Sequence, residues 1–236
     1  AIFQDMFDRK GDKSPNRHCY MKTGIHQLQP LACLCFLLMI SFFFSCNEST
    51  SRGQKPNVEI LEAAFKQFRE SSITHRRFKH SDILPLIKAR KEDFRVEELG
   101  KSVQGREIFQ LGYGEGQTKV LLWSQMHGNE STTTKALFDL FNYFCEKAGS
   151  GEVSGILKDC TIKVIPILNP DGSFLYTREN VNEVDLNRDA DAMTQIESQV
   201  LRAVFEEYQP DFCFNLHDQR TIFAAGPVEK PATLSF

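Results

Sequence analysis

The sequence predicts an α/β fold in which a mixed, mostly parallel sheet carries helices on both faces. Short apolar runs alternate along the chain with longer segments whose apolar residues recur at helical spacing. The apolar runs are nearly continuous, which is typical of strands covered on both faces. Strand and helix in alternation favour a sheet packed between helices. The expected strands are 118–126, 160–168 and 211–217, and the expected helices are 58–70, 132–147 and 192–208.

Local signals place the remaining elements in order along the chain. The segment 100–116, "GKSVQGREIFQLGYGEG", combines a turn with two glycines, a strand and a glycine-rich hairpin turn. The hydroxyl run Ser131–Thr134 is typical of side chains that cap a helix N-terminus, so the helix at 132–147 is expected to begin there. The sequence "NPDG" at 169–172 carries turn residues in the order of a type I turn.

An export signal precedes the predicted globular domain. It starts at Met21, Lys22 supplies a positive charge, and the apolar stretch Leu31–Phe44 follows. These 14 residues are fewer than the roughly 20 that cross a bilayer as a helix, so a signal peptide is expected rather than a membrane anchor. The chain then divides into an upstream segment without a structural role (1–20), the signal peptide (21–45), a polar linker that begins with a cysteine (46–57), and the N-terminal portion of a globular domain (58–236).

The end of the signal, "FFFSCNEST", resembles the lipobox of bacterial lipoproteins and makes Cys46 the expected lipidated residue. The protein would then lie in the bacterial cell envelope, in the periplasm or attached to the outer membrane. Its only contact with the membrane would be the lipid anchor. The alternative is an ordinary signal peptide with a nearby cysteine.

Charge and cysteine content exclude other classes of protein. Lys and Arg total 28 against 31 acidic residues, and without a strongly basic segment no nucleic-acid partner is expected. Of the seven cysteines, only Cys145, Cys160 and Cys213 fall within the predicted domain. Each of the three lies in an apolar stretch, so buried thiols are expected instead of a disulfide framework.

Two histidines close apolar strands in the predicted sheet. The chain has six histidines, and only His127 and His217 lie beyond residue 80. Glu130 follows His127 with two residues between them, in "HGNE". Two histidines and one glutamate form a known ligand set of catalytic zinc, which leaves its fourth position open. A structural histidine at a strand end is the alternative for each residue alone, but the three together predict one metal site.

A polar segment, 169–191, lies between these candidate ligands and is too hydrophilic to belong to the core. It contains Arg178, Asn187 and Arg188, each of which could simply be a solvated surface residue. Guanidinium groups also bind carboxylates in a bidentate manner, and an arginine beside a metal can stabilise an oxyanion. These three residues are therefore candidates for contacts to a substrate.

Six motifs in order resemble the zinc carboxypeptidases of the M14 family. They are "GKSVQGREI", "HGNE", "NPDG", "TREN", "DLNRD" and "NLHDQ", and they cover about residues 100–219. The resemblance implies the zinc carboxypeptidase fold, related to that of phosphorylases and other hydrolases, with one Zn²⁺ per chain held by the three candidate ligands. It also implies that Arg178 polarises the scissile carbonyl and that Asn187 with Arg188 binds the terminal carboxylate of a peptide. Asn129 stands where digestive members of the family carry arginine. The sequence "HGNE" is instead the form found in regulatory and many bacterial members.

The resemblance leaves the general base unassigned, although hydrolysis at zinc needs one. Glu130 is used as a ligand, and Asp218 should point away from His217, to the opposite face of its strand. Glu229 lies in a tail that reads as a loop, whereas the family places its catalytic glutamate further downstream. We therefore expect a fold that is incomplete at the C-terminus, binds zinc and hardly catalyses.

Three functions are compatible with these residues. The first is an exported metallocarboxypeptidase that removes C-terminal residues from peptides or cell-wall peptides. The second is an amino-acid deacylase of the aspartoacylase and succinylglutamate desuccinylase type, which shares "HGNE" and "DLNR". The third is a zinc-dependent envelope binding protein without catalytic activity. The "NPDG" and "TREN" motifs and the export signal favour the first.

Overall fold

The computed structural model describes residues 58–218, 224–225 and 228–231. The predicted signal peptide, Cys46 and the linker up to residue 57 lie outside these residues. From Glu62 onward the described residues belong to one compact unit, whose fold is given below. Within the described residues, no helix combines the length and the apolar character that crossing a membrane requires.

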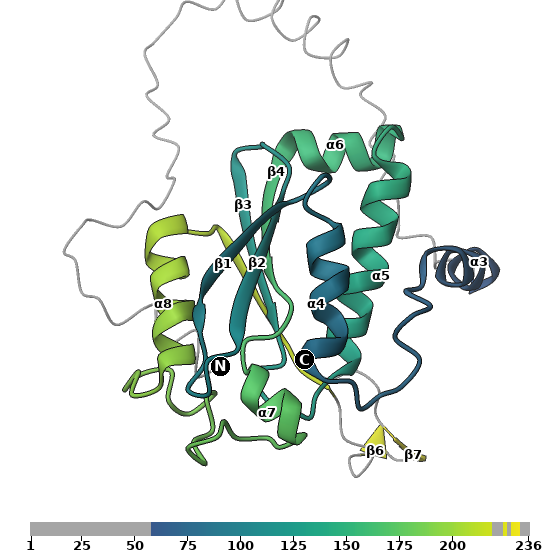
Figure 1. The fold of residues 1–236 in the computed structure, drawn as a ribbon. Coiled ribbons are helices and arrows are strands. Elements are labelled where there is room, and N and C mark those ends of the chain that lie inside the picture. The colour runs from purple at the N-terminus through teal and green to yellow at the C-terminus, as the bar shows by residue number, and fades with distance from the viewer. Residues whose placement is uncertain (1–57, 219–223, 226–227, 232–236) are drawn as a thin grey trace, which may run out of the picture. The chain divides into compact units, whose positions relative to one another are not determined.

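A five-stranded mixed sheet forms the middle layer of this unit (Figure 1). Its strands follow the order β1-β2-β4-β3-β5. β3 pairs in parallel with β4 and with β5, whereas β2 pairs antiparallel with β1 and with β4. The α/β class predicted from the sequence is confirmed. The strands are β1 (Arg95–Lys101), β2 (Glu107–Tyr113), β3 (Thr118–Ser124), β4 (Cys160–Ile165) and β5 (Phe212–Leu216).

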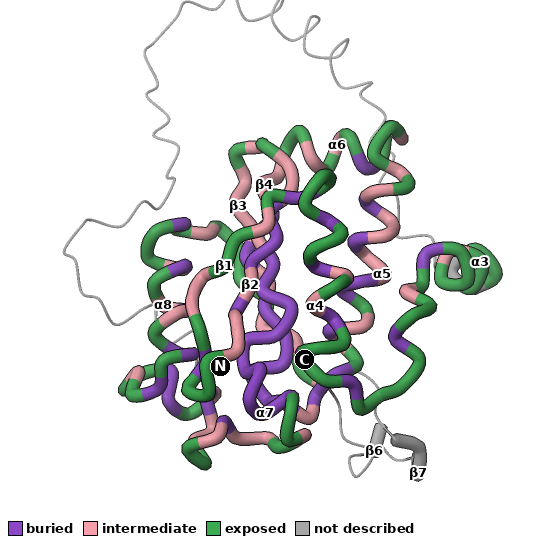
Figure 2. Tube along the Cα trace, in the orientation of Figure 1, coloured by how far each residue is buried: buried purple, intermediate pink, exposed green. Residues whose placement is uncertain are grey.

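Helices cover both faces of the sheet, as the sequence predicts. On one face lie α4 (His80–Ala89) and α5 (Thr132–Lys147), and on the other lies α8 (Ile196–Tyr208) (Figure 1). Each interface has its own hydrophobic core, and the sheet contributes to both. The middle strands β2, β4 and β3 contain buried residues, whereas the edge strands β1 and β5 contain none (Figure 2). The fully buried residues include Ile83, Leu111, Phe138 and Phe141 in the first core and Leu121, Trp123 and Ile165 in the second.

Apolar runs and helix caps explain where these elements form. β3 and β4 contribute side chains to both cores because each is covered on both faces, which requires the near-continuous apolar sequence. The N-terminus of α6 (Gly151–Asp159) is capped by Ser150, whose hydroxyl accepts from the backbone N–H of Val153. A helix that the sequence did not predict, α4, begins where the carboxylate of Asp82 accepts from the backbone N–H of Lys79.

Two local predictions were wrong. The "NPDG" sequence forms the start of a short helix, α7 (Pro170–Leu175), in place of a type I turn. Asn169 caps this helix by accepting from the N–H of Gly172, and Pro170 occupies its first turn, where no backbone donor is needed. The glycine-rich turn after β2 does not form a hairpin, because β4 is inserted between β2 and β3 in the sheet.

The edge strand β5 is more exposed than its sequence predicts. β5 stands at the end of the strand order, and Phe212 and Phe214 are 57% and 49% exposed. Cys145, Cys160 and Cys213 are free thiols, as expected, but only the first two are partly buried and Cys213 is exposed. The tail predicted as a loop contains a short antiparallel pair, β6 (Ala224–Ala225) with β7 (Val228–Pro231).

Candidate metal centre

The ends of two neighbouring parallel strands bring the candidate ligands together. Ser124, the last residue of β3, is paired with Leu216, the last residue of β5. His127 follows the end of β3 after a two-residue connection, and His217 follows β5 directly. Carboxyl ends of parallel strands meet at one edge of a sheet, where α/β proteins place their sites. The two histidines, which are far apart in the sequence, therefore lie close together in the fold.

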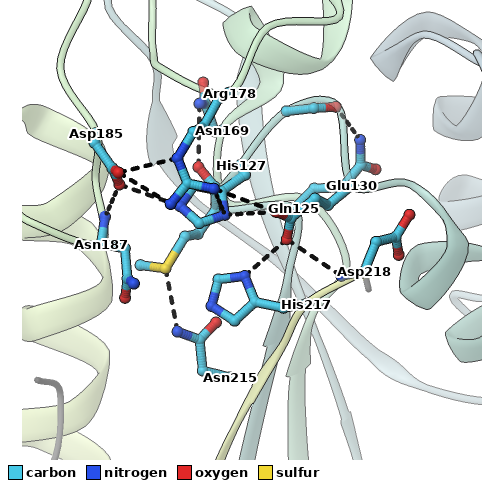
Figure 3. Close-up of polar contacts among 12 residues, drawn as sticks. Gln125, His127, Glu130, Asn169, Arg178, Asp185, Asn187, Asn215, His217 and Asp218 are labelled. Carbon is cyan, nitrogen blue, oxygen red and sulfur yellow. Dashed lines mark hydrogen bonds and ion pairs between the residues drawn. The ribbon is translucent and has the colours of Figure 1, made fainter. Parts of the chain in front are cut away.

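The three candidate ligands converge on one point (Figure 3). Nδ1 of His127 lies 2.9 Å from Oε1 of Glu130, and Nδ1 of His217 lies 2.7 Å from Oε2 of the same carboxylate. One donor atom from each residue can be chosen so that all lie within 4.8 Å of one another. His127 and Glu130 are buried, whereas His217 is exposed, so the point is open to solvent on one side.

The chemistry of this donor set fits a zinc ion. Nε2 of His127 lies 3.1 Å from Oδ1 of Asp185, an arrangement that fixes the ring and leaves the Nδ1 lone pair directed at Glu130. A nitrogen lone pair beside a carboxylate oxygen is favourable only when a proton or a cation lies between them. Two imidazoles and one carboxylate are a known ligand set of zinc in hydrolases, where the metal acts as a Lewis acid.

The charge state of Glu130 supports the same conclusion. Burial by itself raises the pKa of this carboxyl group, but hydrogen bonds with His127 and His217 outweigh it and lower the pKa to about 2. The carboxylate is therefore ionised across the physiological range. A metal ligand must be in this state to bind.

Arg178 lies directly beside the candidate ligands. Its Nη1 donates to Nδ1 of His127 at 3.2 Å and lies 3.5 Å from Oε1 of Glu130. Its Nε and Nη2 lie 3.1 Å from Oδ2 of Asp185, so the guanidinium bridges Asp185 and His127 (Figure 3). Burial raises the pKa of Asp185, but the charges of His127 and Arg178 outweigh it, and the net pKa is lowered. The arginine is thus held at the centre by a carboxylate whose ionised form is favoured.

The helix that follows the "HGNE" loop is not capped by the hydroxyl run, which corrects the sequence prediction. The backbone N–H groups of Thr132 and Thr133 donate to the carboxylate of Asp218, at 3.2 and 3.3 Å. Ser131 uses its hydroxyl to donate to the backbone carbonyl of Arg76. A carboxylate at a helix N-terminus also interacts favourably with the helix dipole, which a hydroxyl does much less.

Asp218 therefore links the two strand ends. Its side chain lies at the start of α5, while its backbone N–H donates to Oε2 of Glu130 at 3.2 Å. It also forms an ion pair with Arg76 at 3.3 Å. The carboxylate is occupied in capping the helix.

The remaining predicted site residues lie next to this centre without joining its hydrogen-bond network through their side chains. The backbone N–H of Asn187 donates to Oδ1 of Asp185 at 2.9 Å. Arg188 is exposed, and its side chain has no hydrogen-bond or ion-pair partner among the described residues. Asn129 is half-buried, and its Oδ1 has no hydrogen-bond partner within that part of the chain.

The sequence reasoning missed Asp185 and did not assign to Asp218 its role in capping α5. Asp185 opens the "DLNRD" motif, and a carboxylate beside a cluster of candidate ligands is a common partner for the second nitrogen of a metal-binding histidine. That rule could have selected it. The role of Asp218 in capping α5 depends on a contact across 86 residues of sequence, for which no local signal exists.

Comparison with known proteins decides the family. The zinc carboxypeptidase family, Peptidase_M14, matches residues 82–218, which is more than half of the chain. The chain belongs to this family. The match extends from α4 to the last candidate ligand and confirms the resemblance seen in the six motifs.

Curated relatives and solved structures agree with this assignment. The catalytic chain of carboxypeptidase N from Homo sapiens is 28% identical over 141 residues, which cover 49% of this chain and 31% of the relative. Carboxypeptidase D from Mus musculus is 31% identical over 111 residues, which cover 40% of this chain and 8% of the relative. The chain thus matches less than a third of the length of these relatives.

The fold is shared with bacterial carboxypeptidases of known structure. A metallo-carboxypeptidase from Burkholderia cenocepacia superposes with a TM-score of 0.54 at 23% identity, over 60% of this chain and 41% of the other. A putative carboxypeptidase from Burkholderia mallei ATCC 23344 superposes with a TM-score of 0.51 at 25% identity, over 59% and 38%. At these identities the likeness supports a common fold and leaves the activity to the site itself.

Proposed function

We propose that this chain is the metal-binding portion of a zinc metallocarboxypeptidase, which hydrolyses the C-terminal residue of a peptide. The observation that carries the proposal is the convergence of two imidazole Nδ1 atoms on the two oxygens of Glu130. One zinc ion would be held by His127, Glu130 and His217 and would supply the Lewis acid for peptide hydrolysis.

Arg178 is the proposed catalytic residue. Its guanidinium lies beside the donor atoms of His127 and Glu130, where the carbonyl of a scissile bond would meet the metal. A preorganised cation at this position stabilises the negative charge that develops on the carbonyl oxygen. The ion pair with Asp185, at 3.1 Å, holds the guanidinium in place before substrate binds.

Asn187 and Arg188 are the proposed binding site for the terminal carboxylate. Arg188 is exposed and has no side-chain partner among the described residues, so its guanidinium is free to form a bidentate pair with a substrate. The backbone of Asn187 is fixed by its hydrogen bond to Asp185, which ties this segment to the metal centre. A peptide with a free C-terminal carboxylate, from a protein or from the cell wall, is the substrate class that fits.

The assay compares pairs of peptides that differ only at the C-terminus. We expect zinc-dependent release of the last residue from free acids and none from C-terminal amides. Cleavage of both at the same rate would contradict the carboxylate site. Hydrolysis of N-acylated amino acids in place of peptides would indicate the deacylase. Zinc binding without turnover of either substrate would indicate the binding protein.

We also propose that the general base is not among the described carboxylates at the centre. Glu130 is held by both histidines, Asp185 by His127 and Arg178, and Asp218 by the start of α5. Residues 47–236 alone should therefore bind zinc and turn over peptides very slowly. Turnover comparable to that of a C-terminally extended form would contradict this, and Glu229→Gln would then be the variant to examine.

Finally, we propose that the protein is exported and carried by a lipid on Cys46. This rests on the sequence of the signal and the cysteine that follows it. One acyl chain binds a membrane only marginally, so stable attachment implies several chains. Expressed from Met21 in a bacterial host, the protein should partition into detergent, and Cys46→Ser should release it to the aqueous phase. A wild-type protein that stays wholly in the aqueous phase would contradict the anchor.

A further inference from the structure

Three consecutive backbone carbonyls around His127 all accept hydrogen bonds. The carbonyl of Met126 accepts from Nδ2 of Asn169 at 3.2 Å, and that of Gly128 accepts from Nε2 of Gln125 at 2.7 Å. The carbonyl of His127 itself accepts from the N–H of Glu130 at 3.0 Å. Two side-chain amides therefore hold the carbonyl groups of the residues on either side of the candidate ligand.

Both amides are themselves fixed by the surrounding structure. Gln125 and Asn169 are 1% and 0% exposed, so a lost hydrogen bond could not be replaced by bulk water. Oδ1 of Asn169 accepts from the N–H of Gly172 at 2.8 Å, and Oε1 of Gln125 accepts from the hydroxyl of Thr134 at 2.8 Å. Turning either amide over would place oxygen against oxygen, so each has one favourable orientation.

The backbone near these amides also restricts the loop. Gln125 has a φ of 45°, a left-handed conformation that is uncommon for a residue other than glycine. Gly128 packs so closely on α7 that a Cβ atom there would lie 1.9 Å from the backbone carbon of Gly172. The "HGNE" loop is thus held between α5, α7 and the end of β3 with little freedom to move.

We propose that Gln125 and Asn169 are positioning residues that act as an amide clamp on His127 and thereby set the zinc affinity of the centre. The inference rests on the proposed metal centre and adds two residues that do not touch the metal. A ligand held in place before binding loses less conformational freedom when the metal arrives. Without the clamp the loop 126–130 would sample other conformations. The apparent affinity for zinc would then fall in proportion to the fraction of molecules whose loop is in the binding conformation.

The test measures zinc affinity directly by competition with a chromogenic chelator, so it does not depend on peptidase activity. Gln125→Met keeps the length of the side chain and removes the donor, and Asn169→Ser keeps an oxygen that can cap α7. Removing a partner that orients a metal ligand typically weakens binding about 10- to 100-fold. We expect at least a tenfold rise in the Kd for Zn²⁺ for each variant. The visible spectrum of the Co²⁺ form should also change, because the ligand geometry becomes heterogeneous.

The matched control is Asn142→Ser. Asn142 is a partly buried residue whose side-chain amide likewise donates to a backbone carbonyl, that of Phe68 at 2.9 Å, but it lies further along α5. This variant should lose stability in urea and keep the zinc affinity of the wild type. Equal losses of affinity in the control and the clamp variants would reduce the clamp to general stability and overturn the proposal.

Gln125→Gly is the second variant, in case Gln125→Met does not fold. Glycine adopts a φ of 45° readily, so it relieves the backbone while it removes the amide. Weaker zinc binding in this variant supports the clamp, and wild-type affinity in both Gln125→Gly and Asn169→Ser overturns it. Failure of the metal centre itself is distinguishable, because the wild type would then bind zinc no better than His127→Ala.

Discussion

In the metal-free protein, Glu130→Gln should remove much of the loss of stability that the wild type suffers on acidification. The pKa of Glu130 is lowered from its usual 4.5 to about 2, because hydrogen bonds with two imidazoles outweigh the effect of burial. The folded-state pKa is below the unfolded one. The ionised carboxylate therefore contributes stability that is fully present above about pH 4.5 and is lost as the pH falls towards 2.

The magnitude follows from the two pKa values. Between pH 6 and pH 3 an isolated carboxyl group with these values loses about 2 kcal/mol of folding free energy. Glutamine does not ionise, so the difference in unfolding free energy between wild type and Glu130→Gln should shrink by about this amount over the same interval. The assay is urea unfolding at several pH values in the presence of a chelator.

Glu197→Gln is the control for this experiment. Glu197 is fully buried, and burial raises its pKa in spite of hydrogen bonds from Asn180 and Val103. The stability that the protonated Glu197 contributes is present below its unfolded-state pKa and is lost as the pH rises through its folded-state pKa. The difference in unfolding free energy between the wild type and Glu197→Gln should therefore change with pH in the opposite direction to that of Glu130→Gln. A Glu130→Gln curve that runs parallel to the wild type from pH 6 to pH 3 would refute the reasoning.

Two further predictions concern the arginines and Asp185. In a form of the protein that hydrolyses peptides, Arg188→Ala should chiefly raise KM, because a contact to the bound carboxylate is made before the reaction, and Arg178→Ala should chiefly lower kcat. Steady-state kinetics on one peptide series measure both constants. Variants that both changed chiefly KM, or both chiefly kcat, would contradict this division of roles. Asp185→Asn should weaken zinc binding about 10- to 100-fold, since Asp185 orients His127 through Nε2. Chelator competition measures this, and an unchanged Kd would exclude the role of Asp185.

The sequence predicted the parts of the fold that depend on local pattern. The helix at 132–147 was placed correctly because its apolar stripe and its polar start are both local features. The strands at 118–126, 160–168 and 211–217 were found because buried parallel strands need nearly continuous apolar sequence, although each ends earlier than predicted. The helix α7 was missed because "NPDG" satisfies the rules for a turn and those for a helix start equally well.

Long-range pairing could not be derived in this way. Nothing in the segment 107–124 indicates that β4 lies between β2 and β3, because strand order depends on contacts between residues far apart in sequence. For the same reason the cap of α5 was assigned to nearby hydroxyls, whereas Asp218, two residues beyond the end of β5, supplies it. The candidate ligands could be predicted from the sequence, because only two histidines follow residue 80 and each comes at the end of a predicted strand.

The measurement that tests the central claim most directly is the zinc content and affinity of the purified protein beside its ligand variants. The account predicts about one equivalent of zinc per chain, as expected for one site with three protein ligands. His127→Ala and His217→Ala should each lose most of this zinc, while Cys160→Ser, which changes a thiol at the far end of β4, should keep it. Zinc bound with wild-type affinity in both histidine variants would contradict the metal centre described here.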